Sequence, residues 1–435
     1  MTVEAVAYSP SGLLSRMVRS EFLRHGALIF GATMSLNAAS YAFHFLMARR
    51  LGPEVYGSLV SLLAITAVIT IPASIVAMIV AKYVAEFHAL EEHGKIAALA
   101  RLVVSRLGIL AAAIVLCGLI FEHSVAAFVR VREPSAILLC AVIAAASIML
   151  PALRAVAQGE QRFGCVAVSY LTEGAGRFVG GTALVYLGFG VRGALLGYLT
   201  GALLSLAYTA SRIALRRAGS DVVRLDVRRM LQAFAAVALS IVALQVVMAA
   251  DVIAVRHFFD ARTAGLYGGM ALAGKMLLFA VTFIPTILLP KGAAAAARGD
   301  DAMPLLVKAI AVTAVVCGAV LLAVALEPRL VLRVVAGTAY VAEAKYLLLY
   351  VTGIALLAFA SVVANFEISL HRFRFIVPCA LACLADVAAL FVFHRDVGQF
   401  VLAFTLGNAL VLLSTVSGPL LAFRRASCSA APLVP

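Results

Sequence analysis

The sequence predicts an all-α integral membrane protein. Of its 435 residues, 64% are hydrophobic and only 13% are charged, and the mean hydropathy is +1.07. A soluble globule of this length needs more polar side chains than this to cover its surface. The apolar residues also gather into runs of about 20, the length of helix that crosses the hydrocarbon layer of a bilayer. Composition and run length therefore both indicate a polytopic membrane protein.

The apolar runs correspond to about twelve predicted transmembrane helices. An even number of spans places both termini on the same side of the membrane. The shortest run, at 376–393, contains Asp386. The predicted spans cover residues 26–48, 58–81, 99–121, 135–157, 165–187, 193–215, 231–255, 265–290, 304–326, 343–368, 376–393 and 400–423.

The basic residues predict the orientation of these spans. The net charge is +14, but Lys and Arg stand singly or in pairs between apolar runs rather than in a polar domain. This arrangement favours a role in membrane orientation over nucleic-acid binding. With the N-terminus inside, the inner segments hold roughly twice as many Lys and Arg residues as the outer ones, in agreement with the positive-inside rule. Residues 1–25 lack the apolar core of a cleavable signal peptide, so we expect a cytoplasmic lead-in.

The chain also predicts two related halves. Its largest inner break, the arginine-rich residues 212–230, lies near the middle. Short motifs recur on the two sides of this break at an offset of about 210 residues, among them Tyr56-Gly57 with Tyr267-Gly268 and Ile71-Pro72 with Ile284-Pro285. The predicted organisation is a cytoplasmic segment at 1–25, a six-helix bundle at 26–215, a cytoplasmic linker at 216–230, a second six-helix bundle at 231–423 and a cytoplasmic tail at 424–435.

Several of these segments resemble one family. They are residues 50–57 (RLGPEVYG), residues 158–163 (QGEQRF), residues 251–267 and the prolines that follow them. The chain resembles the polysaccharide-exporter branch of the multidrug/oligosaccharidyl-lipid/polysaccharide (MOP) flippase superfamily, which contains the Wzx-type flippases of O-antigen and exopolysaccharide repeat units. The resemblance implies two bundles around a central cavity that opens alternately to each side of the bacterial inner membrane. It also implies transport of undecaprenyl-diphosphate-linked sugars.

Polar groups inside predicted spans are the main candidates for function, because a charge at bilayer depth is costly and usually faces a cavity or a partner. Lys275 lies near the middle of the eighth span, where it could bind a phosphate or pair with Asp251. Asp251, late in the seventh span, could balance Arg256 or bind a coupling proton or sodium ion. For Asp386 the sequence leaves open whether it lines an inner vestibule or only meets neighbouring helices.

Two further sets of polar residues follow helical spacing. Asn37, Ser40 and His44 share one face of the first span, either as a sugar-contacting stripe or as a hydrogen-bonded seam between helices. Glu173 and Arg177 stand four residues apart in the fifth span, which favours an internal ion pair over substrate contact.

The break after the first span predicts a bend, because Gly52 permits a positive φ and the following proline fixes a dihedral. We expect Tyr56 at the membrane interface. Arg49 and Arg50 lie on the predicted outer side, as does Arg256 at the matching place in the second half. They form either a cationic rim to the cavity, suited to an anionic diphosphate, or a set of side chains that snorkel to the interface.

The predicted function is therefore a flippase for lipid-linked oligosaccharides, with a multidrug or cation antiporter of the same superfamily as the alternative. A membrane polymerase or glycosyltransferase is disfavoured because it would need a sizeable polar loop with carboxylates or arginines, whereas the longest outer break, at about 327–342, has one Glu and two Arg. The chain lacks a phosphate-binding P-loop and a His-Glu-x-x-His motif, and its 7 cysteines are scattered and fall mostly in apolar runs. We expect no enzymatic activity, no cofactor and no metal. The expected partners are lipid-linked oligosaccharide, membrane lipid, a coupling ion and other polysaccharide-assembly proteins.

Overall fold

The protein is all-helical throughout the part of the chain that the structure describes. The computed structural model describes residues 21–131, 133–213, 227–281, 284, 288, 301–370 and 372–429, with side chains from residue 28 onward except 227–234, 236 and 417–429. Within the described residues, each predicted span falls on helix, and the all-α fold class is confirmed. Most of the predicted linker, the end of the predicted span 265–290 and Pro285 of the Ile284-Pro285 motif lie outside the described residues.

The elements follow the predicted order, but some spans are joined and others are divided. The first two spans form one long helix, and the fifth span contains a short π-helix. The elements are α2 (Glu21–Ala89), α3 (His93–Phe128), α4 (Ser135–Gly159), α5 (Phe163–Ala175), η1 (Gly176–Gly180), α6 (Gly181–Tyr186), α7 (Gly190–Arg212), α8 (Val227–Phe258), α9 (Ala261–Val281), α11 (Met303–Leu326), α12 (Pro328–Val335), η2 (Thr338–Glu343), α13 (Ala344–Ser369), α14 (Ile376–Val392) and α15 (Val397–Ser429).

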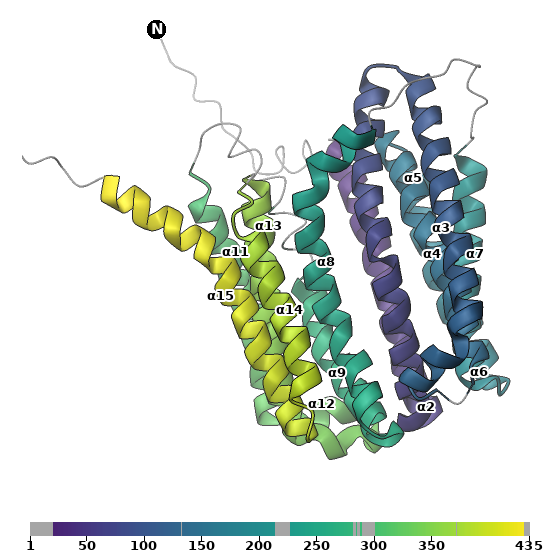
Figure 1. The fold of residues 1–435 in the computed structure, drawn as a ribbon, viewed down its shortest axis with the longest axis vertical. Coiled ribbons are helices and arrows are strands. Elements are labelled where there is room, and N and C mark those ends of the chain that lie inside the picture. Colours follow the sequence, from purple (N-terminus) through teal and green to yellow (C-terminus); the bar gives the residue numbers. More distant parts are fainter. Residues whose placement is uncertain are drawn as a thin grey trace, which may run out of the picture.

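The helices stand side by side in two groups. In Figure 1, α2 to α7 form the purple and blue group, and α11 to α15 form the green and yellow group, with the teal α8 and α9 between them. The buried core around α8 and α9 continues into α13, α14 and α15, so these two helices belong with the second half. They also pack against α2, which makes α2, α8 and α9 the meeting point of the two halves.

Large apolar side chains cover much of the outer surface. On α3, for example, Ile109 is 66% exposed and Ile120 is 62% exposed. Exposed apolar side chains on this scale are unfavourable in water and are the normal surface of a helix in lipid. The outward faces of the helices are therefore suited to a bilayer, while their polar residues lie between helices.

Backbone geometry at two positions shapes the junction between the halves. Gly52 bends α2 with φ +73° and ψ 171°, as its place before a proline predicts. At the matching point of the second half, α8 ends and α9 begins after Asp260, whose carboxylate accepts the backbone N–H groups of Arg262 and Thr263. Hydrogen bonds from Thr263 hold the pKa of Asp260 below its usual range. Both bends lie at the end of the molecule where α12 is found, which we call the closed end (Figure 1).

At the closed end the backbones of α2 and α9 touch. A Cβ atom added to Gly57 would lie 2.6 Å from the Cα of Gly265, and one added to Gly265 would overlap the carbonyl group of Pro53. Only glycine permits two helices to come this close. The two copies of the repeated motif therefore pack against each other, and this contact sets the distance between the halves. Tyr56, expected at the membrane interface, is instead buried beside this contact.

Arginines from each half bind carbonyl groups of the other half around this contact. Arg49 of α2 donates to the carbonyl oxygens of Arg333 and Val334, at 3.1 and 2.6 Å, where α12 ends. Arg256 of α8 donates to the carbonyl oxygen of Val129, at 2.9 Å, just past the end of α3. The last carbonyls of a helix lack intrahelical partners and carry partial negative charge, so both contacts are favourable.

Further bonds complete this set, which we call the reciprocal arginine contacts. Arg256, which is buried, also donates to Ser58 Oγ and to the carbonyl oxygen of Arg130, both at 2.8 Å. Arg130 in turn donates to the carbonyl oxygen of Phe259, at 3.2 Å. Arg49 and Arg256 come from matching positions of the two halves, and all three arginines reach across to the other half.

We predict that Gly265→Ala destabilises this arrangement by about 1–3 kcal/mol, because the added methyl group forces α2 and α9 apart. The thermal midpoint of the purified protein in detergent should fall by several degrees. The matched control is Gly318→Ala in α11, where an added Cβ has nothing within 4 Å. Equal midpoints for the two variants would contradict the proposed role of the glycine contact.

Candidate functional site

A cavity of about 330 Å³, lined mainly by apolar surface with a few polar and charged groups, lies between the two halves. Its walls come from α2, η1 and α7 on one side and from α8 and α9 on the other. The volume lies at the lower end of the range for small-molecule sites. The lining residues are Leu36, Asn37, Ser40, Tyr41, His44, Tyr56, Val60, Arg177, Tyr198, Val252, Gly268, Ala271, Leu272, Lys275 and Phe279.

The cavity brings four of the predicted site residues together. Asn37, Ser40 and His44 follow one face of α2, and Lys275 faces them from α9. Among the described residues, the lysine, arginine, aspartate and glutamate side chains that line this cavity are Lys275 and Arg177 alone, and both are cations. The walls therefore favour an anion over a cation.

The three residues on α2 differ in how much of their hydrogen-bonding capacity is free. His44 is held between Tyr56 and Tyr198, whose hydroxyl groups lie 3.3 and 3.0 Å from its two ring nitrogens. Ser40 donates to the carbonyl oxygen of Leu36 and accepts from another side chain. Asn37 has no hydrogen-bond partner among the described residues, so its amide is available to a ligand such as a sugar hydroxyl.

Lys275 both lines the cavity and pairs with Asp251. Its Nζ lies 2.9 Å from Asp251 Oδ1 and donates to the carbonyl oxygen of Met248 at 2.6 Å. The other carboxylate oxygen of Asp251 accepts the hydroxyl groups of Tyr350 and Tyr267, at 2.8 and 3.2 Å. Asp251 is fully buried behind Lys275. The two roles left open for Lys275 are therefore compatible, because one ammonium group can pair with Asp251 and still face the cavity.

A second buried carboxylate lies behind this pair. Asp386 of α14 is 1% exposed, and neither of its carboxylate oxygens has a hydrogen-bond partner among the described residues. It lies against Gly407 of α15 and interacts electrostatically with Asp251. A buried carboxylate without donors is costly, so Asp386 is suited to binding a proton or a cation.

Apart from Arg177, the other predicted residues lie outside this cavity. Glu173 and Arg177 form the expected contact, with Arg177 Nη2 2.5 Å from Glu173 Oε1, but only Arg177 reaches the cavity wall. Arg49 and Arg256 bind carbonyl groups at the closed end, and Arg50 lies over the ring of Tyr186. The structure does not bring these three arginines together with Lys275. Arg256 instead lines a second cavity, of about 540 Å³, at the closed end.

Sequence reasoning missed the position of Arg177 on the cavity wall and its neighbour Tyr198. An arginine at bilayer depth often indicates a cavity, but a glutamate four residues away favoured an ion pair within one helix over contact with a substrate. Arg154, near the inner end of the predicted span 135–157, is buried between α4, α5 and α7 and also binds Glu173. Spacing within one helix cannot reveal a second partner from another helix.

Two groups of membrane helices meet at one end, beside a cavity that both groups line. No family model matches the sequence, and no curated protein matches it.

Solved structures with the same fold include MATE family transporters of the MOP superfamily and a lipid II flippase. One is the inward-facing conformation of a multidrug resistance MATE family transporter, with a TM-score of 0.77 and 13% identity over 93% of this chain and 99% of the other. The outward-facing conformation of such a transporter gives a TM-score of 0.66 at 13% identity, over 95% and 98% of the two chains. The lipid II flippase MurJ, in an inward closed conformation, gives 0.68 at 14% identity, over 91% and 87%. The chain therefore shares the fold of these solved structures.

We predict that Lys275→Met lowers stability by about 3–5 kcal/mol, because it leaves the fully buried Asp251 carboxylate without its counter-ion. The double variant Lys275→Met/Asp251→Asn removes both charges and should recover most of the loss. Thermal midpoints of the purified proteins measure the difference. A single variant as stable as the double variant would show that the pair does not act as a unit.

Proposed function

We propose that this protein is a flippase that moves undecaprenyl-diphosphate-linked oligosaccharide repeat units from the cytoplasmic to the outer leaflet, for O-antigen or exopolysaccharide biosynthesis. The observation that supports this proposal most directly is the charge of the cavity wall. Lys275 and Arg177 face the same cavity from the two halves. Cations at a site of this kind favour the diphosphate of a lipid-linked sugar.

The other lining groups suit the rest of such a headgroup. Asn37 offers a free amide, and Tyr41, Tyr56 and Tyr198 line the cavity with rings that can pack against a sugar. The cavity is too small for a prenyl chain, which in this proposal stays in the lipid while the headgroup enters. One solved neighbour is named as a flippase of lipid II, so the same fold is used for a lipid-linked substrate elsewhere.

The multidrug or cation antiporter is the second candidate, since other neighbours are MATE transporters. A cationic substrate favours acidic cavity walls. Here Asp251 is fully buried behind Lys275, and Glu173 is paired with two arginines, so neither carboxylate lines the wall. This arrangement favours the anionic substrate. No feature of the described residues favours an enzymatic reaction, and we propose none.

The carboxylates of the second half are the proposed ion-coupling site. Asp251 and Asp386 are both buried and interact electrostatically, so a proton or sodium ion could bind there. Lys275 competes with such an ion for Asp251. A diphosphate that draws Lys275 toward the cavity therefore favours ion binding at Asp251, and the reverse follows by thermodynamic reciprocity.

Alternating access in this proposal depends on the closed end. With both termini in the cytoplasm of a bacterial inner-membrane protein, the closed end faces outward and the cavity serves the cytoplasmic side. The higher TM-score to the inward-facing than to the outward-facing MATE conformation supports this assignment. Opening to the outside then requires the reciprocal arginine contacts to break.

Deletion in the native bacterium tests the function. We predict loss of a surface polysaccharide and accumulation of undecaprenyl-linked oligosaccharide, because the intermediate is made but does not cross. Complementation with Lys275→Ala should fail or fall at least about tenfold, since it removes a cavity cation and leaves Asp251 unpaired. Mass spectrometry of extracted lipids measures the intermediate.

The control variant is Arg192→Ala, whose exposed side chain pairs with Glu133 inside the first half and lies outside the central cavity. It should complement fully. No loss of polysaccharide and no lipid-linked intermediate in the deletion strain would overturn the flippase proposal. Increased sensitivity of that strain to cationic drugs would instead support the antiporter.

We also predict that Arg256→Gln opens the closed end. The substitution removes charge-assisted bonds to α2 and to the end of α3, each contributing about 1.5–3 kcal/mol. Ala264, buried at this end, can be replaced by cysteine in a protein without its native cysteines. The rate at which a membrane-impermeant maleimide, added from outside, labels this introduced cysteine should rise about tenfold or more.

Arg192→Gln serves as the matched control, because this arginine lies at the same end but bonds only within the first half among the described residues. Its labelling should equal that of the unsubstituted protein. Unchanged labelling in Arg256→Gln would show that the reciprocal arginine contacts do not hold the closed end together.

A further inference from the structure

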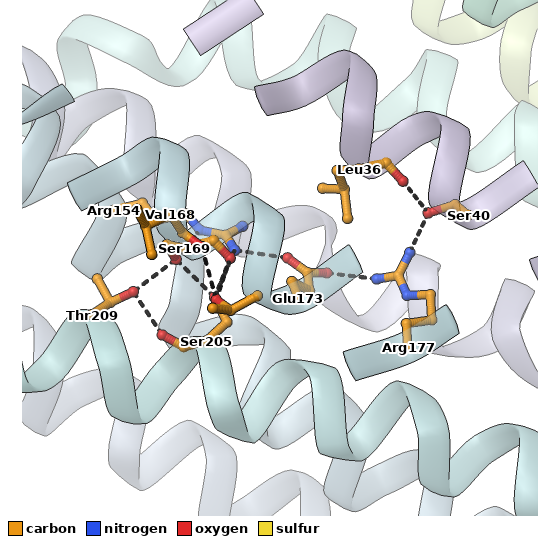
Figure 2. A network of polar contacts seen from close by, with 10 residues as sticks. Leu36, Ser40, Arg154, Val168, Ser169, Glu173, Arg177, Ser205 and Thr209 are labelled. Carbon is orange, nitrogen blue, oxygen red and sulfur yellow. Dashed lines mark hydrogen bonds and ion pairs between the residues drawn. The ribbon is translucent and has the colours of Figure 1, made fainter. Parts of the chain in front are cut away.

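One carboxylate in the first half serves two arginines. Glu173 of α5 lies 2.8 Å from Arg154 Nη2 through Oε2 and 2.5 Å from Arg177 Nη2 through Oε1 (Figure 2). All three side chains are largely buried. A single negative charge cannot neutralise two guanidinium groups, so this network carries one surplus positive charge.

Arg154 is the member of the network that is saturated by protein groups. Besides Glu173, it donates to Ser169 Oγ at 2.8 Å and to the Ser169 carbonyl oxygen at 3.0 Å. It also donates to Ser205 Oγ at 2.9 Å, and Thr209 bonds to Ser169 in the same cluster (Figure 2). Arg154 is enclosed by α4, α5 and α7 and does not reach the cavity.

Arg177 is the member that faces the cavity. Its Nη1 donates to Ser40 Oγ at 2.6 Å, and its guanidinium lies 4.1 Å from the centre of the Tyr198 ring. Ser40 and Tyr198 are themselves cavity-lining residues. The surplus charge of the network is therefore presented where a ligand can reach it.

Lys275 on the opposite wall has a different charge balance. It has a carboxylate of its own, since Asp251 makes a one-to-one pair with it at 2.9 Å. The pair has no net charge, and Asp386 behind it adds no positive charge. The attraction of the cavity for an anion therefore comes mainly from the Arg177 side.

Local backbone structure keeps Arg177 at this place. It belongs to the π-helix η1, a local widening of the helix that is frequent at functional sites. Gly201 of α7 packs on the same turn, and a Cβ added there would lie 2.5 Å from the carbonyl oxygen of Glu173 and 2.8 Å from the backbone nitrogen of Arg177. Gly176 also packs against Gly201. The glycine contact leaves the backbone of η1 little freedom to carry the guanidinium away.

We propose that Arg177 is the primary binding residue for the diphosphate group of the substrate, with Glu173 and Ser40 as its positioning residues and Lys275 as a secondary contact. This inference rests on the function proposed above. The ligand chemistry is a diphosphate ester in a lipid headgroup, which neutralises the surplus charge of the Arg154–Glu173–Arg177 network. A purely structural network has no need of a second arginine at the cavity wall.

The opposite effects of two substitutions test the proposal. The probe is farnesyl diphosphate, and its affinity for the full-length protein in nanodiscs is measured by titration calorimetry. Arg177→Gln should weaken binding about tenfold or more, since it removes a charge-assisted contact. Glu173→Gln should strengthen binding several-fold, because it raises the surplus charge while both arginines remain. A structural role predicts that both substitutions weaken binding.

Two further variants complete the set. Arg177→Lys should recover part of the affinity, and Arg192→Gln, outside the cavity, should bind like the unsubstituted protein. Equal affinity in Arg177→Gln and the unsubstituted protein would overturn the assignment of Arg177 while leaving the proposed flippase in place. Absence of binding to the unsubstituted protein, with farnesyl and undecaprenyl diphosphate alike, would overturn the proposed function together with this inference.

Two controls keep the result decisive. If Arg177→Gln does not fold, judged by size-exclusion profile and thermal midpoint, Glu173→Gln alone decides: stronger binding supports the inference, and equal or weaker binding overturns it. A parallel titration uses phosphatidylglycerol as the anionic lipid. Equal dependence of its binding on Arg177 would assign the site to lipid headgroups in general and overturn the diphosphate assignment.

Discussion

The contact between Gly57 of α2 and Gly265 of α9 sets the distance between the two halves at the closed end. It lets two helix backbones meet without intervening side chains. Close packing of this kind is a principal source of helix association in a bilayer, because the apolar lipid provides no hydrophobic driving force between helices. With this contact in place, Arg49 and Arg256 can reach the ends of helices in the opposite half. The cavity then lies beside the same junction, with Tyr56 shared between the junction and the cavity wall.

Each half has one buried ion pair beside the cavity, but the charge of the next buried residue differs between the halves. The pairs are Glu173 with Arg177 in the first half and Asp251 with Lys275 in the second. The first half adds an arginine to its pair, and the second half adds a carboxylate, Asp386. The first half therefore carries surplus positive charge beside the cavity, and the second half carries surplus negative charge. The proposed anion site lies on the first and the proposed proton or cation site on the second, so binding at the two sites can be linked through Lys275.

The ends of helices supply the contacts that hold the closed end. Carbonyl groups at the ends of α3, α8 and α12 have no partners within their own helices, and arginines from the other half satisfy them. Such contacts are directional and can be broken without exposing a hydrophobic core. They are suited to an interface that forms and separates during transport, whereas the glycine contact is suited to fixing its geometry.

Much of the architecture follows from the sequence alone. Apolar run length predicted the spans, because the bilayer requires about 20 residues of helix per crossing. The offset between repeated motifs predicted two halves, and Gly52 predicted the bend in α2. Helical spacing also placed Asn37, Ser40 and His44 on one face, because such spacing is a property of a single helix.

Contacts between helices were decided only by the tertiary structure. It joined Arg154 to Glu173, which turned an expected neutral pair into a network with surplus positive charge. It also placed Arg49 and Arg256 against carbonyl groups of the opposite half, and it buried Tyr56. The physical reason is the same in each case. The sequence determines which residues are too polar for lipid, but the partners that satisfy them come from helices distant in the chain, and only packing brings those helices together.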